Sequence, residues 1–232
     1  MPFGITEVAK NTLLTQQAAM QIIAHNVANA HTEGYVRQVP VMEPIPGPPL
    51  GTAQLGAGYG ARMAAVKRLQ HSFAAAQSDR QLALLGRERA TRDMLGQVEA
   101  IFSELGGTGL VNNLAAFFSS FEQIGADPTN LAARQETVAR AELVADIIAG
   151  RHQQLHALRT VADEHLFDHV REANGLAHQI ADLNRKIGEA TVDPVINDLK
   201  SLRDTAMSRL SELTGAYYIE QPNNQVDVLI GG

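Results

Sequence analysis

Two pairs of histidines are the first residues in this sequence whose spacing could do chemistry. His152 and His156 are four residues apart, and so are His165 and His169. On a helix each pair would share one face, which is the spacing of zinc-binding helices. However, the first pair lacks the glutamate of a His-Glu-x-x-His pattern, and both pairs alternate with apolar residues. We expect structural or solvent-facing histidines and no metal site, and keep a helical His-rich metal-binding module as an alternative.

Three glycines, Gly56, Gly58 and Gly60, have the spacing of a nucleotide-binding loop. Such a loop needs a strand before it and a helix after it, whereas here a proline-rich stretch precedes the glycines. The sequence also offers no Ser/His/Asp set, no Walker sequence and no paired carboxylates in a pocket-like context. It therefore predicts no catalytic residues, no cofactor and no enzyme.

Composition narrows the class of protein further. The 232 residues carry a net charge of −6 and no cysteine, which excludes disulfides and thiolate chemistry. The sequence has no basic stripe of the kind that binds nucleic acid. It also has no apolar run near the ~18 residues that are needed to span a membrane. The N-terminus has no secretory signal peptide. From the residues alone, we would expect a cytoplasmic protein.

Residues 5–29 have the pattern of an amphipathic helix, with a polar opposite face. The apolar stripe is narrow, as in a coiled-coil seam, and a lone helix of this kind is marginal in water. The helix should therefore need a partner. We predict an assembly seam that consists of Val8, Leu13, Met20, Ile23 and Val27.

The rest of the chain predicts a mainly α fold. Residues 30–62 hold five of the nine prolines and should form an extended loop or an irregular edge strand. Helices are expected over 63–105, 109–125, 129–189 and 195–214 as a long-helix antiparallel bundle. Residues 217–230 read as a hairpin, the start of a β region. The predicted domains are 1–62, 63–214 and 215–232, the last truncated.

A cluster of phenylalanines lies in the second of these helices. Phe117, Phe118 and Phe121 could form an exposed partner site, but an aromatic stripe at helical spacing more often belongs to the core. We therefore expect these rings to be buried.

The most specific motif lies where the first helix ends. Asparagine and glycine there suit a capped helix end and a turn, and a tyrosine can anchor the loop. The string also resembles the N-terminal signature of the flagellar axial protein family of rod, hook and hook-associated proteins. The residues that match are Asn26, Val27, Ala28, Asn29, Thr32, Gly34, Tyr35 and Arg37.

Three later stretches are similar to flagellar hook-associated protein 1, the hook–filament junction family. They are Asp127-Pro128 with Ala133-Arg134-Gln135, the run from Ile180 to Ile187, and the run from Asn197 to Leu213. Lys200-Ser201 stand where that family usually has Leu-Asp. Rod and hook subunits are expected to be β-rich after the signature, whereas this chain is predicted to be helical.

This resemblance implies a structural subunit that joins hook to filament and contributes to motility. It implies self-association in a ring and contacts with hook protein and a second hook-associated protein. It also allows an export chaperone as a partner. It implies an extracellular location reached through the flagellar type III export system without a cleaved signal peptide, which replaces the cytoplasmic expectation. In the family, the first helix pairs with a C-terminal helix that lies outside this sequence.

Before assembly the first helix should be largely disordered, so residues 1–30 of the isolated chain should exchange amide protons rapidly. Two alternatives to the junction role remain besides the metal-binding module. One is a distal rod or hook subunit, and the other is a cytoplasmic helical adaptor.

Overall fold

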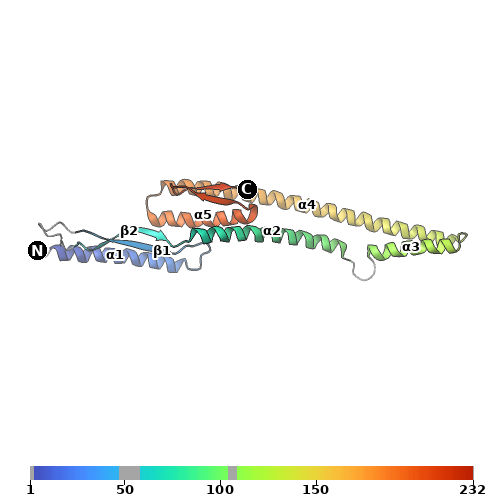
Figure 1. The fold of residues 1–232 in the computed structure, drawn as a ribbon, viewed down its shortest axis with the longest axis horizontal. Coiled ribbons are helices and arrows are strands. Elements are labelled where there is room, and N and C mark those ends of the chain that lie inside the picture. Colours follow the sequence, from blue (N-terminus) through green and yellow to red (C-terminus); the bar gives the residue numbers. More distant parts are fainter. Residues whose placement is uncertain (1–2, 47–57, 104–108, 232) are drawn as a thin grey trace. The chain divides into compact units, whose positions relative to one another are not determined.

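The computed structural model describes residues 3–46, 58–103 and 109–231. The described part is mainly helical, with short strands, as the sequence predicts (Figure 1). It divides into two compact units. One combines residues 1–86 with residues 172–232, and the other is residues 87–171.

The first unit begins with a helix docked on a β-hairpin. Helix α1 is Phe3–Ala28, and the hairpin pairs β1, Gln38–Pro44, with β2, Ala61–Arg68, in antiparallel register. The register shifts between Val41 and Met42. Such a bulge increases the local twist of the pair. The α1 helix contacts both strands.

The hairpin corrects the predicted start of the second helix. Residues 63–68 are strand where a helix was predicted, and the helix α2, Ser72–Phe102, begins nine residues later than expected. Alanines at 61, 64 and 65 favour a helix locally, but pairing with β1 overrides that propensity. The predicted boundary between residues 62 and 63 therefore falls inside β2. Residues 30–62, predicted as an extended loop or an irregular edge strand, contain the edge strand β1 and its register shift.

The rest of the first unit is a helical hairpin that carries two strands. Helix α4 is Leu131–Glu189, and its C-terminal part lies beside α5, which is Asp193–Thr214 (Figure 1). The chain then continues into the strands β3, Tyr217–Glu220, and β4, Val226–Leu229. Pro194 lies in the first turn of α5, where a missing N–H costs nothing. Gly215 ends α5 with φ +71°, as the sequence suggests.

The apolar core of this unit lies between α4, α5 and the second hairpin. Ile180 and Leu210 are almost fully buried against Val226. Arg203 is buried beside them, and its Nη1 donates to Asn184 Oδ1 at 2.9 Å and to the Asn224 carbonyl at 2.7 Å. The guanidinium thus anchors the β3–β4 turn on the two helices.

The second unit contains the C-terminal part of α2, the helix α3, Leu110–Ala126, and the N-terminal part of α4. Its buried residues are small or β-branched, among them Ser120, Ala133, Thr137 and Val144. Small side chains let helix backbones approach closely. Asn130 precedes α4 and accepts a hydrogen bond from the Ala133 N–H at 3.2 Å, which caps the helix.

Candidate assembly site around the N-terminal helix

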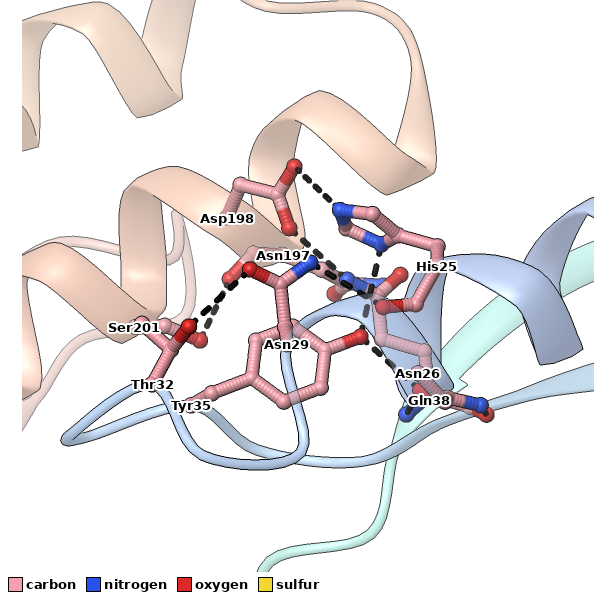
Figure 2. Close-up of polar contacts among 9 residues, drawn as sticks. All are labelled: His25, Asn26, Asn29, Thr32, Tyr35, Gln38, Asn197, Asp198 and Ser201. Atoms are coloured by element: carbon pink, nitrogen blue, oxygen red, sulfur yellow. Dashed lines mark hydrogen bonds and ion pairs between the residues drawn. The ribbon is translucent and has the colours of Figure 1, made fainter.

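Asn26 is the centre of the polar cluster formed by the signature (Figure 2). Its Nδ2 donates to the Gln38 carbonyl at 2.7 Å, and its Oδ1 accepts from the Gln38 N–H at 2.9 Å. The Tyr35 hydroxyl donates to the same Oδ1 at 2.8 Å. One side-chain amide therefore pairs with the first residue of β1 as a neighbouring strand would, and ties the end of α1 to the hairpin.

Tyr35 and His25 extend this cluster to α5. The Tyr35 hydroxyl lies 3.3 Å from His25 Nδ1, and the two rings meet edge to face with centroids 5.6 Å apart. His25 Nε2 lies 3.8 Å from Asp198 Oδ2. Partial burial, and then the charge of Asp198, raise the pKa of the Tyr35 phenol. The phenol therefore stays protonated and keeps its hydrogen bond to Asn26 throughout the neutral range.

Gln38 completes the link and is only 2% exposed. Its Nε2 donates to Asp198 Oδ1 at 2.9 Å, and its Oε1 accepts from Asn197 Nδ2 at 3.3 Å. Asn197 Nδ2 also donates to the Val66 carbonyl at 2.9 Å. Helix α1, both strands of the hairpin and α5 thus meet in one polar network, in which Gln38 and Asn197 are buried.

The loop between α1 and β1 is shaped by the remaining polar signature residues. Asn29 Nδ2 donates to the His25 carbonyl at 3.0 Å, and Thr32 Oγ1 donates to Asn29 Oδ1 at 3.2 Å. Gly34 has φ +74°, and a Cβ there would lie 2.0 Å from Thr205 Oγ1. A glycine is needed both for the backbone angle and for the close approach to α5.

The signature therefore divides into two groups. The structure brings together Asn26, Asn29, Thr32, Gly34 and Tyr35, whereas the side chains of Val27, Ala28 and Arg37 are exposed.

Sequence reasoning missed the partners Gln38, Asn197 and Asp198. Asn197-Asp198 had been noted only as part of a resemblance, and nothing local in the sequence indicates that Gln38 is buried. The pairing depends on contacts between positions about 160 residues apart.

Four of the five residues of the predicted assembly seam lie on a side of α1 that the hairpin does not cover. Leu13, Met20, Ile23 and Val27 are 57–71% exposed, while Val8 is half-buried. At 100° per residue, the four exposed side chains share an arc with Ile5, which is also exposed. We call these five exposed residues, Ile5, Leu13, Met20, Ile23 and Val27, the α1 stripe.

The face that α1 turns to the hairpin is mostly polar or small. Asn11 Nδ2 donates to the Tyr59 carbonyl at 3.1 Å, and Thr15 Oγ1 donates to the Ala61 carbonyl at 2.7 Å. Ala19 and Ile22 are buried between them and Asn26. The helix therefore has an intramolecular partner that the sequence did not reveal, and its apolar stripe is left for other contacts.

The other candidate sites from the sequence have less support in the structure. His152 and His156 stack edge to face, with ring centroids 4.8 Å apart, but within the described ranges no three metal-ligating side chains of the His, Cys, Asp and Glu types gather. Gly56 lies outside the described residues.

Phe118 and Phe121 are exposed and only Phe117 is half-buried, so the prediction of a buried phenylalanine cluster is wrong for two of its three rings. Among the described helices, none is both long and apolar enough to cross a membrane.

Comparison with known proteins connects this arrangement to a family. The family model for the flagellar hook-associated protein FlgK helical domain matches residues 95–232, more than half of the chain. The model for flagella basal body rod proteins matches residues 7–35, the α1 helix and most of the signature.

Named relatives agree with these matches. Flagellar hook-associated protein 1 of Bacillus subtilis (strain 168) is 28% identical over 217 residues, 89% of this chain and 42% of the relative. Its counterpart in Salmonella typhimurium (strain LT2) is 25% identical over 220 residues, with 89% and 37% covered. The chain therefore spans about two-fifths of the length of these relatives.

A solved structure supports the fold. The flagellar hook junction protein FlgK from Burkholderia pseudomallei matches with a TM-score of 0.52 at 25% identity, over 68% of this chain and 26% of that one. The long helical match and the axial signature in front of it lead to the same conclusion. This chain belongs to the flagellar hook-associated protein FlgK family.

Proposed function

We propose that this chain is a structural subunit of the bacterial flagellum that joins the hook to the filament and works by assembly rather than catalysis. The observation that carries the proposal is the two-sided α1 helix. One side is fixed to its own chain by Asn11, Thr15 and Asn26, and the other presents the exposed α1 stripe.

The energetics fit an assembly surface. Burying an exposed Leu, Ile, Val or Met side chain contributes roughly 1.5–3 kcal/mol. The five side chains of the α1 stripe offer several kcal/mol per subunit when a partner covers them, and repetition around a ring multiplies that gain. A helix with the complementary seam is the natural partner, because the spacing is that of a coiled coil.

The signature has a positioning role in this proposal. Its polar members, together with the buried Gln38 and Asn197, hold the end of α1 against β1 and α5, and hydrogen-bonded networks of this kind favour one geometry over its alternatives. The network therefore sets the direction in which the α1 stripe faces. Copies that share one direction can repeat the same contact.

The proposed partners follow from the family. They are further copies of this chain in a ring, the hook protein and a second hook-associated protein, with an export chaperone before assembly. The proposed location is outside the cell in the flagellum, reached by type III export. The matches to hook-associated proteins over most of the chain favour the junction over a distal rod role, since the rod match is confined to residues 7–35.

Deletion of the gene tests this proposal. Electron microscopy should show hooks without filaments, with flagellin shed into the medium, and motility should return when the full-length gene is supplied in trans. Filaments on hooks of normal length in the deletion strain would contradict the junction role. Absence of hooks altogether would favour the rod role instead.

A further inference from the structure

The contact between the β1–β2 hairpin and α5 consists largely of polar groups. Gln38 and Val66 are the buried residues of the two strands, and both are hydrogen bonded to α5. The Val66 N–H donates to Asp193 Oδ2 at 2.9 Å, and the Val66 carbonyl accepts from Asn197 Nδ2 at 2.9 Å. These two α5 side chains therefore satisfy both backbone groups of Val66 as a neighbouring strand would.

Charged groups extend this contact along α5. Arg68 of β2 forms an ion pair with Asp204, and the two side chains are 10% and 22% exposed. Arg68 Nε is buried and has no hydrogen-bond partner among the described residues. Such an atom gains a partner from water when the contact opens, which lowers the free energy of opening. We call the four α5 side chains that bind the hairpin the α5 latch, which is Asp193, Asn197, Asp198 and Asp204.

The apolar core of the first unit is formed by other elements. Among the described residues, the buried cluster around Ile180 and Leu210 includes none from α1 or from the strands β1 and β2. Separating apolar surfaces is costly because it exposes them to water, whereas polar groups that separate gain hydrogen bonds from water. The β1–β2 hairpin should therefore leave α5 at a lower free energy than α4 would.

A second set of contacts holds α1 on the hairpin without α5. Asn11 and Thr15 donate to backbone carbonyls in or beside β2, and Asn26 binds both backbone groups of the first β1 residue. Ala19 lies between these hydrogen bonds and is 6% exposed. We call α1 and the hairpin together the α1 module. The chain continues from the α1 module into α2 through residues 69–71, a short connection about which the module can turn.

We propose that the α1 module opens from α5 as one body, with α1 still docked on the hairpin, when the α5 latch breaks. Openings of this kind occur in native proteins at free energies below that of global unfolding. The open form lets the α1 stripe change direction while α1 stays folded. That use in assembly rests on the proposed function, whereas the opening itself does not.

Three single cysteines in the otherwise cysteine-free, full-length chain test this proposal. Ser201→Cys probes the latch, because at 100° per residue it shares a face of α5 with Asn197 and Asp204. Ala19→Cys probes the contact between α1 and the hairpin, and Ser211→Cys probes the end of α5 beside the core. The three positions are 8%, 6% and 1% exposed, so a thiol reagent reaches each one only when the surface that covers it opens.

The measurement is the rate at which the reagent labels each folded variant, followed by mass spectrometry. Ser201→Cys should react roughly tenfold faster than the other two, or more, because the α5 latch opens more often than the core and the α1 module. Adding Asn197→Ala removes hydrogen bonds to both strands and should speed the labelling of Ser201→Cys by roughly another tenfold. The same addition should leave the labelling of Ala19→Cys and Ser211→Cys unchanged.

Leu202→Ala is the matched control for the latch substitution. Leu202 lies on the same helix and is 57% exposed, so its replacement should change none of the three rates. Asp204→Asn is the second latch variant, for the case in which Asn197→Ala does not fold. It keeps the shape of the side chain, removes the charge that faces Arg68 and should act in the same direction.

Four results would overturn the inference. Equal rates for Ser201→Cys and Ser211→Cys would show that the latch opens only together with the core. A rate for Ala19→Cys equal to that of Ser201→Cys would show that α1 leaves the hairpin as well. The other two are labelling of Ser201→Cys as fast as in the urea-unfolded chain, and an effect of Asn197→Ala no larger than that of Leu202→Ala. None of these results bears on the filaments of the deletion strain, so the proposed function stands or fails separately.

Discussion

At the scale of single residues, the polar part of the signature is a set of side chains that form hydrogen bonds within the chain. Asn26 satisfies both backbone groups of Gln38, a residue buried at 2% exposure. Leaving a buried donor or acceptor without a partner costs about 1–3 kcal/mol. The polar members of the signature therefore have a physical reason to be these residue types, independent of any neighbour in the flagellum.

Replacement of Asn26 tests this role. Asn26→Ala removes the acceptor for Gln38 N–H and for the Tyr35 hydroxyl, so α1 should lose about 1–3 kcal/mol of docking free energy. Amide exchange across residues 3–28 should speed up roughly tenfold or more, since 1.4 kcal/mol is a factor of ten. Hydrogen exchange measured by mass spectrometry on the isolated chain would show this change.

Val27→Ala is the matched control for that experiment, because Val27 belongs to the same motif but is exposed. Its effect on exchange should be small. Equal effects of the two substitutions would mean that the network does not hold α1. The sequence alone predicts rapid exchange throughout residues 1–30, because it shows no partner for the helix. The hairpin supplies a partner, so the protection of α1 against exchange should depend on Asn26.

The partly buried carboxyl of Asp79 in the first unit makes the stability of the fold depend on pH. Burial raises the pKa of Asp79, the nearby Asp204 raises it further, and a hydrogen bond from Ser208 Oγ at 2.6 Å partly offsets both effects. Because the folded pKa is raised, the unfolded chain loses this proton first as the pH increases. The contribution of Asp79 is therefore fully present below its ordinary pKa and is lost as the pH rises through the raised value.

Asp79→Asn should accordingly raise the melting temperature at pH ~7, with the gain shrinking to near zero below the ordinary Asp pKa of about 3.9. Asp182 is the opposite case, since hydrogen bonds from Lys186 and Arg185 lower its pKa. Asp182→Asn should therefore lose a little stability near neutrality. Calorimetry near pH ~7 and below the ordinary Asp pKa would measure the change in melting temperature for both variants. An Asp79→Asn gain that is the same at every pH would contradict the proposed effect of burial.

At the scale of elements, the helices could be predicted well and the first hairpin could not. Local periodicity located all five helices of the described part, with the long α4 and the turn at Gly215 close to their observed ends. The strand β2 has the local sequence of a helix start because it contains several alanines, and its strand character comes from pairing with β1.

Only half of the candidate site could be predicted, because the rest also depends on contacts between distant parts of the chain. Asn26 and Tyr35 belong to a local motif, whereas Gln38, Asn197 and Asp198 meet only in the folded chain.

Packing of α2 on α5 gives a prediction at this scale. A Cβ on Gly86 would lie 2.4 Å from the carbonyl oxygen of Glu212, and a backbone atom cannot move aside easily. Gly86→Ala should destabilise the first unit by roughly 1–3 kcal/mol. Gly96, on the same helix, has open space around it, so Gly96→Ala should stabilise by about 0.5–1 kcal/mol.

Urea denaturation followed by circular dichroism distinguishes the two substitutions. Opposite signs support the close contact between α2 and α5 in the first unit. Stabilisation by both would show that the two helices are further apart at Gly86 than the structure has them.

At the scale of the whole molecule, the described part of the chain combines hydrogen bonds between its elements with apolar side chains that stay exposed. The α1 stripe carries the proposed junction role. The α1 stripe exposes side chains that a self-sufficient protein would bury.

The most direct test of the account is a substitution that removes the α1 stripe without disturbing the fold. Ile23→Asn with Val27→Asn changes two exposed positions, while Gln17→Asn is a control at an exposed position outside the stripe. The measurement is the fraction of hooks that carry filaments, counted by electron microscopy in cells that express each version. The account predicts bare hooks for the double variant and normal filaments for the control, with both proteins folded and exported. Normal filaments on hooks built with the double variant would contradict it.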